Sequence, residues 1–297
     1  MRIKRQDDVT PAVLAVMERT TDPRLREIMV ALVSHLHAFV RDVRLTEDEF
    51  REATAILNEM GRQSNNGHNE TVLMAGSLGV SSLVCLLNNG DRGTTETSQN
   101  LLGPFWRINA PRVDNGGSIV RSQTPGPALF MSGRVLDAAG RPVVGAEIDI
   151  WHSSPVGLYE NQDPDQADFN LRGKFVSDAD GKFWFRSVKP AGYPIPTDGV
   201  VGRLLTAQRR HPYRPAHVHA LIFKPGFKTM ISQIYADDDA NLDTDVQFGV
   251  TEALTAQFVR HDSRHPDTAD VTPPWFALDH TFVLEAGEAR LPRPPIL

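Results

Sequence analysis

The hydrophobic pattern of this chain changes near Gly103, and no other feature of the sequence constrains its fold as strongly. Before that point, apolar residues recur at the three- and four-residue spacing of a buried helix face, most regularly over residues 25–43. Beyond it, short β-type runs alternate with turns rich in proline and glycine. We therefore expect a mainly β protein, with a helical domain over residues 1–103 and an antiparallel β-sandwich domain over residues 104–297.

Three helices are expected in the first part. The apolar face over residues 25–43 gives the first, and Thr46 with Glu49 three residues later forms a capping-box pattern that begins the second. The apolar segment 72–87 gives the third, although Gly76 and Gly79 weaken that prediction. Three such helices carry more apolar surface than the edge of a sandwich can cover, which suggests a subunit interface.

The second part has the spacing of strands and turns that is typical of a sandwich. The runs 130–136, 146–151, 218–223 and 230–235 are bounded by turn residues, and 280–284 is typical of a closing strand. Asp180-Gly181, between the runs 175–177 and 183–185, predicts a hairpin. Asp178 and Asp180 are interpreted as turn residues, because the rest of a calcium-binding EF-hand loop is missing.

Composition excludes several other classes of protein. The net charge of −6 gives no electrostatic case for nucleic acid or an anionic membrane as partner. The single cysteine, Cys85, rules out an intramolecular disulfide. No run approaches the roughly 20 apolar residues of a membrane span, and the first eight residues lack the apolar stretch of a signal peptide. We therefore expect a cytoplasmic protein without a membrane span.

His217-Val218-His219 is the sharpest local signal of chemistry. Residues i and i+2 of a strand point to the same face, so the two imidazoles could form a bidentate metal site. The alternative is a pair of half-exposed strand histidines. If a metal is bound, a carboxylate from Asp237, Asp238 or Asp239 could complete a site with two histidines, although a solvated loop is the simpler interpretation of these aspartates.

Two of the four tyrosines lie in loops beside predicted strands, where functional residues often sit on a rigid scaffold. Tyr159 follows the strand that ends at Trp151, and Tyr193 lies within Gly192-Tyr193-Pro194-Ile195-Pro196. Taken alone, each is interpreted as a packing residue with a satisfied hydroxyl.

Taken together, these residues resemble the intradiol ring-cleavage dioxygenases of the catechol and hydroxyquinol type, which carry non-haem Fe(III). The helical N-terminus also fits this family. The matching segments occur in the family's order and are Leu102-Gly103-Pro104-Phe105, Gly133-Arg134-Val135-Leu136-Asp137, Ile150-Trp151-His152, Gly157-Leu158-Tyr159, Gly192-Tyr193-Pro194-Ile195-Pro196 and Arg214-Pro215-Ala216-His217-Val218-His219.

The resemblance implies one Fe(III) per subunit, held by Tyr159, Tyr193, His217 and His219. Phenolate is a hard anionic donor that favours the ferric state. The resemblance also implies that Tyr193 accepts a proton from a catecholic substrate, which reacts with O₂.

The resemblance assigns further residues to catalysis and to the substrate pocket. Arg214 would stabilise negative charge that develops on the ring, and Gln233 would orient a group at the metal. The implied pocket residues are Leu73, Gly76, Gly103, Pro104, Phe105, Ile195, Pro196, Arg214 and Gln247.

The segments Gly103-Pro104-Phe105 and Asp245-Val246-Gln247-Phe248-Gly249-Val250 are more similar to the hydroxyquinol branch than to the catechol branch. The implied activity is ring cleavage of hydroxyquinol with O₂ to a maleylacetate or 3-hydroxymuconate type of dicarboxylate. The alternative is a catechol or substituted catechol giving a cis,cis-muconate. Gly76 departs from both branches, which tend to have aspartate or proline there, and Gln247 stands where an apolar residue is expected.

The resemblance further implies a homodimer formed through the N-terminal helices, with a phospholipid as a candidate ligand between them. Two other classes of protein are kept as alternatives. A cupin-type Fe(II) oxygenase would use the two histidines and a carboxylate but neither tyrosine. A sandwich binding module would need no metal at all.

Overall fold

The computed structural model describes residues 2–65, 68–89 and 99–295 of the chain. They fall into two compact units, divided between Glu59 and Met60. The expected boundary at residue 103 concerns domains rather than these compact units, and it stays a prediction. The described helices are α1 (Val9–Met17), α2 (Pro23–Asp42), α3 (Glu47–Gln63), α4 (Glu70–Ser77), α5 (Val80–Asn89) and α6 (Val200–Ala207), with short 3-10 helices at Gln6–Asp8, Glu160–Gln162, Leu242–Thr244 and Glu252–Leu254.

The first two predicted helices are confirmed. α2 begins after Asp22, whose carboxylate accepts the backbone N–H groups of Arg24 and Leu25. α3 begins directly after Thr46. There the Thr46 Oγ accepts the Glu49 backbone N–H at 3.3 Å, and the Glu49 carboxylate accepts the Thr46 N–H at 2.8 Å, so the capping box is formed as predicted.

The third predicted helix is wrong in one respect, because the segment forms two helices rather than one. α4 and α5 are separated at Leu78 and Gly79, where Gly79 takes a left-handed φ of 72°. Among the described residues, no single helix is long and apolar enough to cross a membrane. The α4–α5 pair passes that test of length and composition only when joined, and it is bent by 76°.

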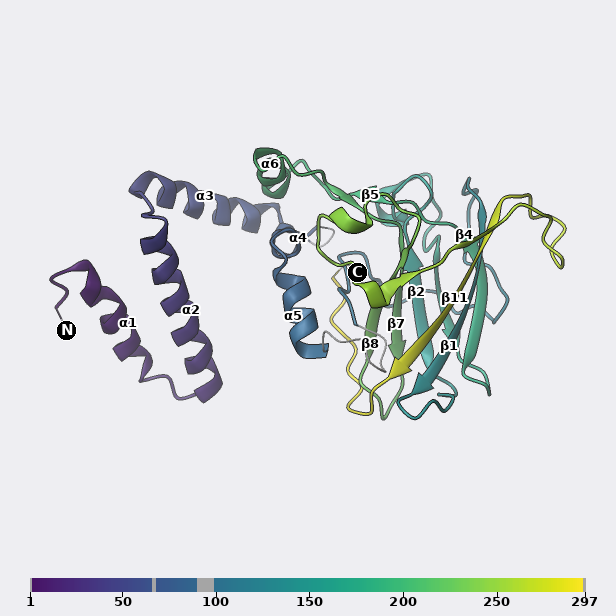
Figure 1. The fold of residues 1–297 in the computed structure, drawn as a ribbon, viewed down its shortest axis with the longest axis horizontal. Coiled ribbons are helices and arrows are strands. Elements are labelled where there is room, and N and C mark those ends of the chain that lie inside the picture. Colours follow the sequence, from purple (N-terminus) through teal and green to yellow (C-terminus); the bar gives the residue numbers. More distant parts are fainter. Residues whose placement is uncertain (1, 66–67, 90–98, 296–297) are drawn as a thin grey trace. The chain divides into compact units, whose positions relative to one another are not determined.

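The second unit contains the predicted β-sandwich (Figure 1). One sheet has the strand order β10-β11-β1-β4 and the other β3-β2-β7-β8-β9, and a two-stranded ribbon pairs β5 with β6. The strands are β1 (Ala128–Asp137), β2 (Glu147–His152), β3 (Arg172–Val176), β4 (Lys182–Val188), β5 (Tyr193–Pro194), β6 (Tyr213–Arg214), β7 (His217–Phe223), β8 (Met230–Ala236), β9 (Thr255–Ala256), β10 (Val259–His261) and β11 (Trp275–Leu284).

The sheets are mixed rather than purely antiparallel. The β7–β8 hairpin pairs antiparallel, as does β2 with β7, which places β7 in the middle of its sheet. The β1–β11 and β8–β9 pairs are parallel. The closing strand predicted at 280–284 is therefore part of a longer strand that lies beside β1.

The hairpin predicted at Asp180-Gly181 is wrong. The turn itself forms, with Asp178 accepting backbone N–H groups from Asp180 and Lys182. However, β3 pairs with β2 and β4 pairs with β1, so the turn carries the chain from one sheet to the other. Phe175 and Phe183 on its two sides are fully buried in the core between the sheets.

Candidate metal and substrate site

β7 carries both histidines of the His-x-His motif into the interior, and each is only 1% exposed. His217 Nδ1 lies 2.7 Å from the Pro215 carbonyl oxygen. Because a carbonyl only accepts, Nδ1 carries the hydrogen and Nε2 is left with a lone pair. The Nε2 atoms of His217 and His219 lie 3.2 Å apart, so the two imidazoles face a common point.

Both imidazoles are neutral at neutral pH. Burial lowers the pKa of His217 to about 3, with Arg214 adding to the effect. Burial also lowers the pKa of His219 well below its usual range, and the neighbouring His217 lowers it further. Neutral imidazole is the form that binds metal ions.

The two predicted tyrosines join this pair from other segments. Tyr159 follows β2 and precedes the 3-10 helix at Glu160–Gln162, and Tyr193 begins β5. Their rings meet edge to face with centroids 5.5 Å apart. Tyr193 lies 5.6 Å from the His217 ring and Tyr159 lies 6.3 Å from the His219 ring, so four potential ligands from three segments converge.

The donor set fits a bound cation. Tyr159 Oη is buried without a hydrogen-bond partner in the described part of the chain, an arrangement that costs roughly 1–3 kcal/mol. Burial, and then Tyr193, raise the pKa of the Tyr159 hydroxyl well above its usual range. A cation held between the tyrosines and histidines would favour the phenolate and so lower the pKa of the Tyr159 hydroxyl.

The aspartates that could have completed a two-histidine, one-carboxylate site are engaged elsewhere. Asp237 accepts the Phe258 backbone N–H, Asp238 pairs with Lys189, and Asp239 accepts the Ala216 backbone N–H at 2.8 Å. Within the described ranges, no group of three or more His, Cys, Asp or Glu side chains could hold a metal. The site therefore depends on its tyrosines.

Arg214, at the end of β6, is a buried cation beside these rings. Its Nε and Nη2 both donate to the Asp245 carboxylate at 3.1 Å. Burial acts to raise the pKa of Asp245, but Arg214 and two backbone N–H groups hold it below its usual range. Asp245 is therefore ionised and pairs with the buried guanidinium. In the described structure, Arg214 Nη1 donates to no side chain or backbone group, although Arg214 lines the cavity described below.

Gln233 on β8 belongs to the same network. Its Oε1 accepts from Arg214 at 3.0 Å and from the Tyr235 hydroxyl at 2.6 Å, while its Nε2 donates to the Leu101 carbonyl at 2.6 Å. These contacts orient Arg214. The predicted action of Gln233 on a group at the metal stays a prediction.

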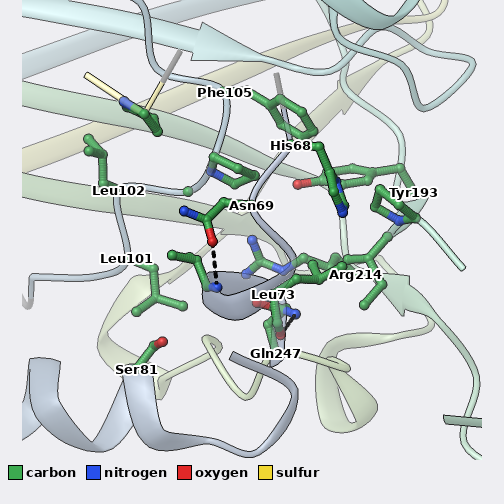
Figure 2. A pocket seen from close by; sticks show the side chains of 16 residues that line it. His68, Asn69, Leu73, Ser81, Leu101, Leu102, Phe105, Tyr193, Arg214 and Gln247 are labelled. Atoms are coloured by element: carbon green, nitrogen blue, oxygen red, sulfur yellow. Dashed lines mark hydrogen bonds between the residues drawn. The ribbon is translucent and has the colours of Figure 1, made fainter. Parts of the chain in front are cut away.

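A cavity of about 270 Å³ lies beside the four rings and is on the scale of a small ligand (Figure 2). Of the four candidate ligands, Tyr193 lines it, and Phe105 on its wall lies 4.5 Å from the Tyr159 ring. Eight of the predicted pocket residues line this cavity: Leu73, Gly103, Pro104, Phe105, Ile195, Pro196, Arg214 and Gln247.

Gly76 is the predicted pocket residue that does not line the cavity. It lies behind Gln247, and a Cβ atom on it would be 1.9 Å from Gln247 Oε1. Figure 2 shows Gln247 next to Leu73.

Sequence reasoning missed several residues of this region. His68 lines the cavity, and its Nε2 lies 2.6 Å from the carboxylate of the buried Glu70, which also accepts the Val201 backbone N–H. The Asn69–Glu70 helix start is a recognisable capping signal, but only the fold brings it to the cavity. The other lining residues that were missed are Asn69, Val72, Ser81, Leu101, Leu102 and Pro295.

Comparisons with known proteins show the family to which the chain belongs. Two protein-family models match the chain, one described as dioxygenase over residues 101–283 and one as catechol dioxygenase N terminus over residues 22–95. The chain belongs to the family of intradiol ring-cleavage dioxygenases and is an enzyme of that class.

Within the family, the chain is similar to enzymes of both branches. It is 42% identical to the hydroxyquinol 1,2-dioxygenase of Rhizobium sp. over 92% of each protein. It is 34% identical to the catechol 1,2-dioxygenase of Candida albicans, over 87% of this chain and 86% of that protein. The solved structure of hydroxyquinol 1,2-dioxygenase from Pseudomonas putida DLL-E4 has a TM-score of 0.86 and 37% identity, covering 95% of this chain and 99% of that one.

Proposed function

We propose that this enzyme opens the ring of hydroxyquinol between its two adjacent hydroxyls, using O₂ and one Fe(III) per subunit. The observation that carries the proposal is the convergence of Tyr159, Tyr193, His217 and His219 beside a cavity of small-ligand size. The similarity to hydroxyquinol 1,2-dioxygenases over most of the chain supports this choice of substrate.

Ferric iron suits this donor set. Two phenolates are hard anionic ligands, and two neutral imidazoles complete a four-ligand set that contains no thiolate. When bound, Fe(III) would act as a Lewis acid that makes the substrate's phenolic hydroxyls more acidic. The tyrosines also separate this proposal from the cupin-type alternative, which uses neither of them.

Two residues of the chain would act directly on the substrate. Tyr193 lines the cavity, so we assign it the acceptance of one phenolic proton. Arg214 also lines the cavity, and its Nη1 makes no hydrogen bond in the described structure, so we assign it the stabilisation of negative charge that develops on the ring. Gln233 and Asp245 are positioning residues, because both accept hydrogen bonds from the Nη2 atom of the guanidinium.

The experiment that tests this function measures oxygen uptake by the iron-loaded enzyme with hydroxyquinol, and identifies the product by mass spectrometry. We expect one O₂ per substrate and a dicarboxylate that retains all six ring carbons and gains two oxygen atoms. Catechol is the alternative substrate, and a faster reaction with catechol would move the enzyme to that branch. No reaction with either hydroxyquinol or catechol, at full iron loading, would contradict the proposal.

We also propose that the protein is a cytoplasmic homodimer that associates through its N-terminal helices, with a phospholipid as a candidate ligand between them. The support is the apolar face of α2, where large side chains remain about half exposed. An apolar patch of this kind on a soluble protein marks an interaction surface. These side chains are Leu25, Ile28, Leu32, Leu36, Phe39 and Val40 on the helix and Val43 at its C-cap.

A further inference from the structure

The side chain of Gln247, which lines the cavity, packs against the backbone of Gly76. Gln247 is 8% exposed and lines the cavity, and its side-chain amide lies on the α4 backbone at Gly76. An ideal Cβ on Gly76 would be 1.9 Å from Gln247 Oε1 and 2.6 Å from its Cδ. Any side chain at position 76 would therefore displace the amide, so the amide fits here only because residue 76 is a glycine.

The orientation of this amide is determined by its neighbours. Gln247 Nε2 lies 3.4 Å from the Leu73 carbonyl oxygen and 3.2 Å from the Ser77 Oγ. Because a carbonyl can only accept, the nitrogen must be the atom on that side. In the described structure, Oε1 accepts no hydrogen bond.

The backbone of Gln247 is held as firmly as its side chain. Its N–H donates to Asp245 Oδ1 at 3.1 Å, and its carbonyl accepts from the Ser82 hydroxyl at 3.1 Å. Asp245 is also the carboxylate that holds Arg214. The amide is thus fixed in position relative to the charged group of the site before a ligand binds.

We propose that Gln247 determines substrate specificity, with its Oε1 accepting a hydrogen bond from the third ring hydroxyl of a trihydroxybenzene and Gly76 providing the space that permits this. The inference rests on the proposed function and extends it. The surrounding wall is largely apolar, with Leu73, Ile195 and Pro196 among its residues, so an unpartnered acceptor there favours a ligand that carries a donor. A catechol, which has no third hydroxyl, leaves Oε1 unpaired.

The test compares kcat/KM for hydroxyquinol with kcat/KM for catechol in the iron-loaded enzyme, together with the anaerobic dissociation constants of both. We expect Gln247→Val to lower the hydroxyquinol-to-catechol ratio about three- to tenfold, the effect of one neutral hydrogen bond. Gly76→Ala should lower the ratio similarly, since its methyl group displaces the amide. In the double variant, Gly76→Ala should add nothing to Gln247→Val.

Gly61→Ala is the matched control, because Gly61 lies in α3 with no neighbouring atom within 4 Å of the added methyl group. It should leave the ratio unchanged. An unchanged ratio in folded, iron-loaded Gln247→Val would overturn the inference, as would equal effects of Gly76→Ala in both backgrounds. A wild-type enzyme that binds hydroxyquinol more tightly than Gln247→Val, but opens neither ring, would support the inference and contradict the proposed function.

Discussion

At the scale of single residues, the site contains a buried ion pair between Arg214 and Asp245. Neither residue is a candidate metal ligand. Arg214 and Asp245 are each 4% exposed. Removing one partner of such a pair leaves the other charge desolvated, which costs more than the pair contributes when intact. Asp245 therefore stabilises the folded state as well as holding Arg214 beside the cavity.

Asp245→Asn should lower the free energy of unfolding by about 3–5 kcal/mol, because it leaves the Arg214 guanidinium buried without a counter-charge. Thermal denaturation should show a fall in Tm of about 10 °C. Asp270→Asn removes the partner of Arg186 at the surface, where the carboxylate side chain is 69% exposed, and should leave Tm unchanged. Equal effects of the two substitutions would contradict the importance of burial.

Asp149 makes the folding stability of the protein depend on pH. Burial raises its pKa from 3.8 to about 6, although Lys174 and the Trp106 indole N–H act against this. The folded state therefore keeps the proton longer than the unfolded state does. The contribution of Asp149 to stability is therefore greatest below pH 4, falls as the pH rises to about 6, and stays lower above that value.

Asp149→Asn should remove this dependence while keeping an acceptor for Trp106. Relative to wild type, the variant should gain up to about 3 kcal/mol in unfolding free energy on going from pH 4 to pH 7.5. Chemical denaturation at the two pH values measures the difference. Parallel pH profiles for the two proteins would count against a raised pKa.

The ligand-type residues could be predicted from the sequence, because the His-x-His spacing is local and Tyr159 and Tyr193 lie in motifs that resemble the family's. The resemblance also named eight residues that line the cavity, Arg214 among them, but it gave no role to Asp245 or His68. Asp245 is 31 positions from the arginine it pairs with, and His68 reaches the cavity only through the fold. Nothing local distinguishes such residues from other polar side chains.

At the scale of elements, β7 positions the histidines because it is paired on both sides, with β2 and with β8. The alternation of its side chains was readable from the sequence. The pairing of β3 and β4 was not, because Asp180-Gly181 specifies a turn without specifying which strands pair. Likewise, Gly76 and Gly79 weakened the prediction of one helix over residues 72–87, but the sequence did not show that the segment breaks at Gly79.

The turn at Gly181 offers a test of how the two sheets are joined. Gly181 has a φ of 74°, and an added Cβ would be 2.5 Å from the Val135 carbonyl oxygen. Gly140 has nearly the same φ, 75°, but open space around it. Gly140→Ala should cost only the left-handed strain, about 1–2 kcal/mol. Gly181→Ala should cost clearly more in denaturant unfolding, and equal costs would contradict the close approach.

At the scale of the whole molecule, the apolar face of α2 determines the expected assembly. We expect light scattering to give twice the 32.9 kDa chain mass, and organic extraction of the purified protein to release phospholipid. Leu32→Glu with Leu36→Glu should give the mass of a single chain, because the substitutions place charge on that face. Ala38→Glu, on an exposed position of the same helix outside the apolar face, is the matched control and should remain dimeric. A single-chain mass for wild type would contradict the dimer.

The most direct test of the central claim is the visible absorption spectrum of the purified protein before and after anaerobic addition of hydroxyquinol. We expect a broad tyrosinate-to-Fe(III) band that shifts when the substrate binds and is lost in Tyr159→Phe. A protein that stays colourless after ferric iron is restored would contradict a site built from Tyr159, Tyr193, His217 and His219.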